Sequence, residues 1–229
     1  MATIRQIRQR IKVAKNIQQI TKAMKMVAAA RLKRAQDRVQ AARPYADTMR
    51  EMMTSLASAA GGEVQHPLLA VRTPRNYGFL IITSDRGLAG SYNSQMLRRA
   101  SEILREYDPN RIKLYLIGRK GIQFFRRRGF NIVSEFQINS TAVSFAEAQD
   151  ITRTIRAAFE NEEIDELILL YTKFRSAISQ TATDVKLLPI QTPEEETTAA
   201  PSNDNDYIFE PEAEALLHAL LPRYLEGQV

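Results

Sequence analysis

The chain has 229 residues, 44% of them hydrophobic, which is enough for one ordinary domain and an additional extended element. It contains no cysteine, which excludes disulfides, thiol catalysis and a zinc site built on cysteine. The net charge of +6 is uneven, because the first fifty residues hold thirteen basic and only two acidic residues. That segment carries +11 and the remainder −5, so we expect an anionic partner to meet the N-terminal segment.

The N-terminal segment predicts one long helix over about 4–56. Its first proline is Pro44 and its first glycine is Gly61, and a run this long without a breaker is helical by default. Such a helix would be about 80 Å long, more than a domain of this size buries alone. Pro44 predicts a bend or a segment boundary near Arg43.

Apolar residues recur along this helix at the spacing of a coiled-coil seam. In its middle part the seam departs from a strict heptad, so it rotates locally and then recovers, and one continuous partner helix can follow it. The seam consists of Ile4, Ile7, Ile11, Ile17, Ile20, Val27 and Leu32.

After Gly61 the pattern changes to apolar runs that alternate with helical segments. The runs predict strands over 77–83, 111–117, 131–136, 166–172 and 184–190, and the segments between them predict helices over 94–107, 120–128 and 145–160. This alternation indicates an α/β fold, a small Rossmann-like domain with a mainly parallel sheet. We therefore predict a shaft helix over 1–60, a linker over 61–76 and a globular domain over 77–206.

Residues 192–206 contain five acidic residues, two prolines and no apolar anchor, so we expect an acidic, mobile loop at the end of the domain. The last segment, 207–229, contains the start of a further helix over 212–225.

The segment SDRGLAGSYN, Ser84–Asn93, lies between a predicted strand and a predicted helix, where nucleotide-binding α/β domains place a phosphate loop. It matches neither G-x-G-x-x-G nor G-x-x-x-x-G-K-[ST]. We interpret it as a tight turn in which Asp85 or Ser84 caps the following helix.

No catalytic or metal-binding constellation stands out. The two histidines, His66 and His218, are isolated in sequence and make poor metal ligands, so we expect surface or capping roles for them. The basic helix suits nucleic acid by charge, but its seam calls for a helical partner. The residues alone leave a nucleotide-binding α/β enzyme and a basic-helix nucleic-acid-binding protein as alternatives to a shaft.

Three segments, in order, resemble one family. Residues 4–36, with ITKAMKMVAAARL at Ile20–Leu32, resemble the N-terminal signature of the gamma subunit of the F-type rotary ATP synthase. The loop Ser84–Asn93 is similar to the family's loop after its first strand. YIFEP and LLPRY near the C-terminus resemble the segments that lead into the family's C-terminal helix.

The resemblance implies a non-catalytic, central-stalk rotor subunit without a cofactor. Such a subunit couples proton-driven rotation of the c-ring to ATP synthesis or hydrolysis in the ring of alpha and beta subunits. The implied partners are the alpha and beta subunits, the epsilon subunit and the c-ring, with no nucleic acid. The implied location is peripheral, at the cytoplasmic face of a bacterial plasma membrane.

Six residues carry partner contacts by this resemblance. Lys22, Met24, Lys25 and Met26 match the segment that faces an acidic loop of the beta subunit, and Tyr207 and Glu210 match the segment that meets the c-ring. The regulatory cysteine insertion of chloroplast members is absent. The family's long C-terminal helix has only begun where the sequence ends at Val229, so it is either truncated or continues outside this sequence, and the sequence does not distinguish the two.

Overall fold

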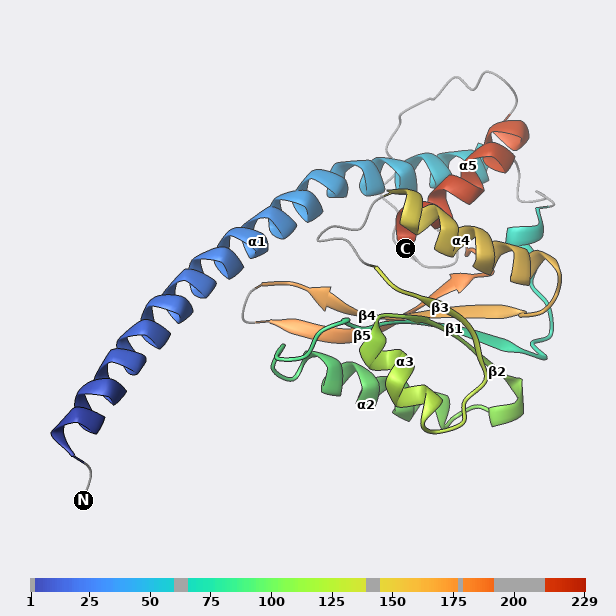
Figure 1. Cartoon of the computed structure of the whole chain (residues 1–229). Coiled ribbons are helices and arrows are strands. Elements are labelled where there is room, and N and C mark those ends of the chain that lie inside the picture. The colour runs from blue at the N-terminus through green and yellow to red at the C-terminus, as the bar shows by residue number, and fades with distance from the viewer. Residues whose placement is uncertain (1–2, 60–65, 139–144, 177–178, 192–212) are drawn as a thin grey trace. The chain divides into compact units, whose positions relative to one another are not determined.

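The computed structural model describes residues 3–59, 66–138, 145–176, 179–191 and 213–229 (Figure 1). The chain divides into two compact units, Met1–Thr48 and Met49–Val229. Helix α1, Ile4–Ala59, provides the described part of the first unit and continues into the second. Its sequence contains no glycine, so nothing but Pro44 opposes helix formation over 56 residues.

A bend or a segment boundary was predicted near Arg43; the helix does not end there, because α1 continues through Pro44. Proline removes one backbone hydrogen bond and crowds the carbonyl four residues earlier. In a helix of this length the neighbouring turns keep their own hydrogen bonds, so one missing bond does not end it.

The second unit is built on a five-stranded sheet in the order β3-β2-β1-β4-β5. Strands β1 (Tyr77–Ile82), β2 (Ile112–Ile117), β3 (Ile132–Phe136) and β4 (Glu166–Phe174) are parallel, and β5 (Gln180–Leu188) is antiparallel to β4. The central strand is β1, in which Leu80 pairs with Tyr115 on one side and Leu169 on the other. The predicted α/β class with a mainly parallel sheet is confirmed.

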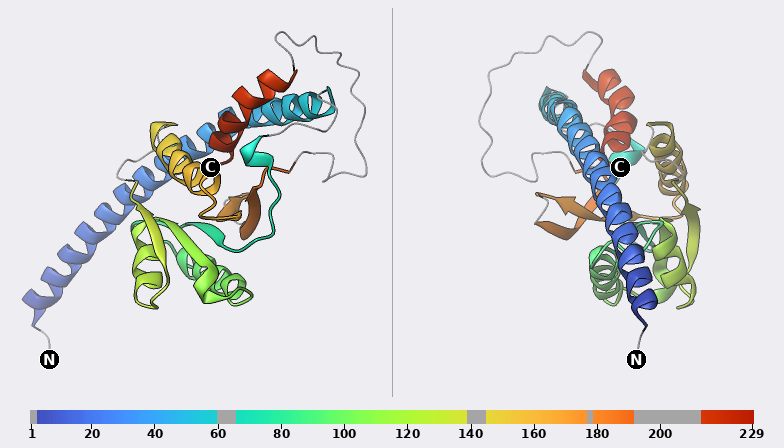
Figure 2. Two further views of the ribbon diagram at one scale, coloured as in Figure 1. Left: turned by 90° about the vertical axis from the view of Figure 1, so that its right-hand side faces the viewer. Right: turned by 60° about the vertical axis from the view of Figure 1, so that its left-hand side comes forward.

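Helices cover both faces of this sheet (Figures 1 and 2). Helices α2 (Tyr92–Leu104) and α3 (Arg119–Arg126) lie on one face, and α4 (Phe145–Glu160) and α5 (Ala213–Gln228) on the other. Two short 3₁₀ helices, η1 (Pro67–Leu69) and η2 (Pro109–Arg111), precede β1 and β2.

Two hydrophobic cores follow from the alternation of side chains along β1. Phe79 and Ile81 pack with α2 and α3, whereas Leu80 packs with α4 and α5. The last turns of α1 join the second core: Met53 and Leu56 are buried in the same cluster as Leu217 of α5. Met49, Met53 and Leu56 recur at steps of four and three, which places them on one helix face.

A close junction joins the ends of β1 and β2. The amide of Thr83 donates to the carbonyl of Ile117 at 2.8 Å, and the buried Thr83 hydroxyl donates to the same carbonyl at 2.9 Å and accepts from the amide of Gly121 at 2.9 Å. Gly118, with a φ of 91°, turns the chain from β2 into α3 against the Thr83 backbone. This junction fixes where the loop after β1 begins.

Candidate partner interface

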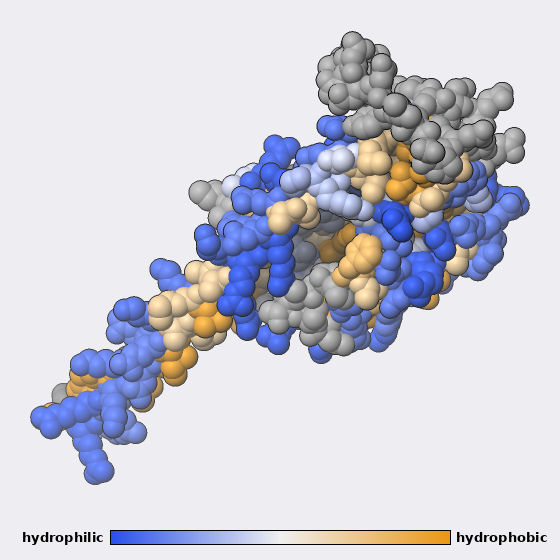
Figure 3. All heavy atoms as spheres, turned by 90° about the horizontal axis from the view of Figure 1, so that it is seen from above, coloured by the Kyte–Doolittle hydropathy of each residue, from blue (hydrophilic) through white to orange (hydrophobic). Residues whose placement is uncertain are grey.

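Helix α1 presents an exposed surface of mixed basic and apolar residues. Every residue from Thr3 to Ala35 is exposed, including all seven seam residues. Figure 3 shows apolar side chains interspersed with hydrophilic ones along this helix. Each unburied Ile or Leu forgoes roughly 1.5–3 kcal/mol of transfer free energy, so the seam is suited to a partner helix.

The four residues assigned to the beta-subunit contact divide between two faces of α1. At about 100° per residue, Met24 falls within about 60° of Ile17, Ile20 and Val27 around the helix, whereas Lys22 and Met26 lie about 160° from it. Met24 and Met26 are 64% and 61% exposed, and Lys22 and Lys25 are exposed as well. Met24 thus shares the seam face, and the two lysines and Met26 point elsewhere.

The loop Ser84–Asn93 is tied together by its own polar groups. The Ser84 amide donates to Asn93 Oδ1 at 3.1 Å, and Asn93 Nδ2 donates to the Ser84 hydroxyl at 2.8 Å. The Ser84 hydroxyl also donates to the Arg86 carbonyl at 2.6 Å. Between these bonds Leu88 adopts a φ of 61° and is fully exposed at the loop.

The expectation that Asp85 or Ser84 caps the helix after the loop is wrong. Helix α2 begins at Tyr92 with Ser91 as its N-cap, and no side chain caps it. Asp85 instead accepts a hydrogen bond of 3.0 Å from the amide of Arg119, at the start of α3. The Asp85 carboxylate therefore caps α3 and not α2, and a carboxylate is favourable at a helix N-terminus.

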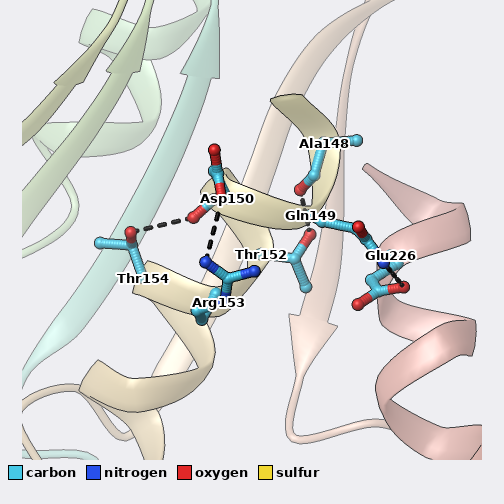
Figure 4. A network of polar contacts seen from close by, with 7 residues as sticks. All are labelled: Ala148, Gln149, Asp150, Thr152, Arg153, Thr154 and Glu226. Atoms are coloured by element: carbon cyan, nitrogen blue, oxygen red, sulfur yellow. Dashed lines mark hydrogen bonds and ion pairs between the residues drawn. The ribbon is translucent and has the colours of Figure 1, made fainter. Parts of the chain in front are cut away.

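The C-terminal helix α5 is anchored to α4. Leu217, Leu221 and Leu225 are buried, and Gln149 Nε2 donates to Glu226 Oε2 at 3.3 Å (Figure 4). The figure also shows the bonds within α4, in which Arg153 pairs with Asp150 at 3.0 Å. The helical start predicted over 212–225 is therefore a docked helix, and the segment is part of the domain's second core.

The predicted c-ring residues and the acidic loop are not covered by the structure, whereas the two histidines are. Tyr207 and Glu210, assigned to the c-ring contact, and the acidic loop 192–206 lie outside the described residues. His66 has the capping role expected for it, but the two histidines are not isolated in space, because their rings lie 4.8 Å apart. The sequence carries no signal for that pairing, since the two residues are far apart along the chain.

No helix in the described ranges is long and apolar enough to span a membrane, and no cluster of potential metal ligands occurs in them.

An exposed basic helix with an apolar seam, continuous with an α/β domain whose loop matches neither phosphate-binding fingerprint, is typical of a helical shaft that binds partner proteins. The comparisons with known proteins agree with this class. The family model described as ATP synthase matches residues 3–229. The ATP synthase gamma chain of Desulfitobacterium hafniense is 44% identical over 229 residues, covering 100% of this chain and 79% of the relative. That of Brevibacillus brevis is 45% identical over 228 residues, covering 99% of this chain and 78% of the relative.

Solved structures share the fold. The central stalk and c-ring structure of the Tetrahymena thermophila mitochondrial ATP synthase matches with a TM-score of 0.67 at 25% identity, covering 91% of this chain and 88% of that chain. A rotor chain of the Euglena gracilis mitochondrial ATP synthase matches with a TM-score of 0.58 at 18% identity, covering 96% and 86%. The chain belongs to the ATP synthase gamma chain family, and it is a non-catalytic subunit of the central stalk.

Proposed function

We propose that α1 is the part of the rotor that turns inside the ring of alternating alpha and beta subunits, and that the α/β domain is the foot that meets the epsilon subunit and the c-ring. In this scheme residues 1–60 are the shaft and residues 77–206 the body of the foot. One observation carries the proposal: in a chain of this family, the longest helix leaves its seam and its cations exposed. The nucleotide-binding enzyme and the nucleic-acid-binding protein are set aside, because neither accounts for this family relationship.

The segment around Met24 is proposed to face the acidic loop of the beta subunit. Two features support it: the cations of Lys22 and Lys25 are fully available to an acidic surface, and both thioethers are exposed. Methionine is flexible and polarizable, so it adapts to successive partners without forming one deep binding minimum. Because Met24 lies on the seam face, packing against the partner helix is its alternative role, and the two roles are compatible.

Tyr207 and Glu210 are proposed to contact the c-ring, on the basis of sequence resemblance alone. The whole subunit is proposed to work peripherally at the cytoplasmic face of a bacterial plasma membrane. The support for this location is that the relatives named above are bacterial ATP synthase gamma chains, which belong to a membrane-associated complex.

The substitution Met24→Lys tests the beta-subunit contact. It adds a cation where the partner surface is expected to be acidic, and an ion pair at a partly desolvated contact contributes about 1 kcal/mol. If this pair forms in one rotary position and breaks in the next, it lengthens one dwell about fivefold. We expect proton pumping per ATP hydrolysed to fall in reconstituted complexes that assemble normally.

The matched control is Val71→Lys, which adds the same charge at a position outside α1 that is 85% exposed. It should leave both hydrolysis and pumping at the level of the unsubstituted complex. If Met24→Lys lowers hydrolysis and pumping in parallel with the amount of assembled complex, the position is structural and the proposed contact is wrong.

A further inference from the structure

The chain's two histidines form a contact between two elements of the second unit. His66 precedes η1, His218 lies on α5, and their ring centroids are 4.8 Å apart with the planes inclined at 60°. His66 is half-buried and His218 is exposed. Because imidazole gains a proton near neutral pH, a contact between two imidazole rings is sensitive to pH in that range.

The backbone around His66 requires the neutral ring. Its Nδ1 accepts a hydrogen bond of 3.0 Å from the amide of Leu68, which caps η1. Leu68 is fully buried, and its carbonyl accepts from the amide of Ile190 at 2.8 Å. Since Nδ1 is the acceptor, the neutral ring carries its hydrogen on Nε2. A second proton has only Nδ1 to bind, so protonation removes the cap from the turn that holds Leu68 in the core.

The surroundings of His66 also disfavour its protonation. Burial lowers the pKa of His66 below its ordinary value of 6.5, and the neighbouring His218 and Arg156 lower it further, while Glu160 opposes them. Arg156 and Glu160 both belong to α4 and pair with each other at 3.5 Å. The carboxylate that would stabilise an imidazolium is thus already shared with a guanidinium.

We propose that His66, packed against His218, forms a pH-sensitive latch that holds η1 against α5 when the His66 ring is neutral and releases it when that ring is protonated. This goes beyond the proposed function, because it concerns how the domain responds to acid and not what it contacts. The release is local, since Leu221 and Leu225 keep the rest of α5 in the core.

The direction of the effect follows from proton linkage. Above pH 6.5 His66 is neutral in both the folded and the unfolded chain, and the latch contributes its full stabilisation. As the pH falls through 6.5, the unfolded or released form takes up the proton first, so this stabilisation is lost progressively down to the lowered pKa of the folded form. Metal binding is a poorer role for the pair, because Nδ1 of His66 is engaged and no third ligand lies close in the described ranges.

The test is a nuclear magnetic resonance titration of the histidine rings and of the Leu68 amide in the whole chain, from about pH 8 to about pH 5. We expect the His66 ring to titrate below pH 6.5 and the Leu68 amide shift to follow with the same midpoint. Protection of that amide against hydrogen exchange, corrected for intrinsic rate, should fall about tenfold for each pKa unit by which folding lowers the His66 pKa.

Two variants separate the latch from general acid sensitivity. His66→Asn keeps a side-chain oxygen that caps the turn but does not titrate, so the Leu68 amide should keep its protection at low pH. His218→Asn removes the facing imidazole, so the His66 midpoint should move up towards 6.5 while the Leu68 amide still follows it. The proposal is overturned if the Leu68 amide does not follow the His66 ring in the unsubstituted chain, or if His66→Asn loses protection with acid to the same extent.

Discussion

The substitution Gly118→Ala addresses the junction at which the chain leaves β2. A Cβ atom on Gly118 would overlap the carbonyl oxygen of Thr83 and lie 2.7 Å from its carbonyl carbon and 2.9 Å from its hydroxyl oxygen. Those are atoms of the backbone and of a buried side chain that makes three hydrogen bonds, so they cannot move aside without loss. The new methyl group can therefore be accommodated only by separating the ends of β1 and β2.

The magnitude has two parts. A φ of 91° with a ψ of 138° is a backbone conformation that non-glycine residues adopt only with strain, of about 1–3 kcal/mol. Forcing a methyl group into a filled site adds about 1–3 kcal/mol. The sum, about 2–6 kcal/mol, is a large share of the roughly 5–15 kcal/mol by which folded domains are stable.

Urea unfolding followed by circular dichroism measures this free energy. The control is Gly129→Ala: Gly129 has a φ of 72°, but a Cβ there would meet nothing within 4 Å. The control should cost about 1–2 kcal/mol, the strain of the backbone alone. If Gly118→Ala costs no more than Gly129→Ala, the close approach to Thr83 does not restrict position 118 and the reasoning is wrong.

Two further predictions concern buried polar groups. The hydroxyl of Tyr115 is buried and has no hydrogen-bond partner among the described residues, so Tyr115→Phe should raise the free energy of unfolding by about 1 kcal/mol, seen as a higher urea midpoint. Burial raises the pKa of Tyr115 to about 12, so the unsubstituted chain should lose free energy of unfolding as the pH rises from 10 towards 12. Tyr115→Phe lacks this hydroxyl and should lose less free energy of unfolding over the same range; an equal loss in both chains would refute the assignment. Asp165 is buried and accepts from the amides of Arg75 at 2.7 Å and Asn76 at 2.9 Å, so Asp165→Ala should cost about 2–4 kcal/mol in thermal unfolding, and a cost below about 1 kcal/mol would contradict it.

Local patterns predicted most of the sheet and its helices. The strand expected over 77–83 is observed at Tyr77–Ile82, and the helix expected over 145–160 is observed at those residues. These elements are either buried apolar runs or amphipathic segments bounded by turn residues, so their own side chains specify them.

The edge strand was placed less well. A strand was expected over 184–190, but β5 spans Gln180–Leu188 and is antiparallel to β4. It ends before Pro189, which has no amide hydrogen to donate to a ladder. Its first residues are polar and pair with the end of β4, where Gln180 lies opposite Phe174. This part of β4 extends past Leu170, the last β4 residue that pairs with β1. Such polar residues give no apolar signal, and only the partner strand specifies them.

Contacts between segments far apart in the chain could not be predicted from the sequence. Nothing in the pattern near Asp85 indicates that it meets the amide of Arg119, and nothing near His66 indicates His218. On α1, helical periodicity alone indicates which side chains share a face, but every residue from Thr3 to Ala35 is exposed, so the seam stays a prediction. Which partner covers each face is a property of the assembly, so the contact assignments of Lys22 and Met24 stay predictions.

The burial of Met49, Met53 and Leu56 gives the end of α1 a structural role in the domain. These three side chains belong to the second unit, where all three are buried and Met53 and Leu56 share the domain's second core. Withdrawing three such side chains costs roughly 5–9 kcal/mol, about ten times the thermal energy. The last turns of α1, from Met49 onward, are therefore built into the domain itself, and removing them would open its second core.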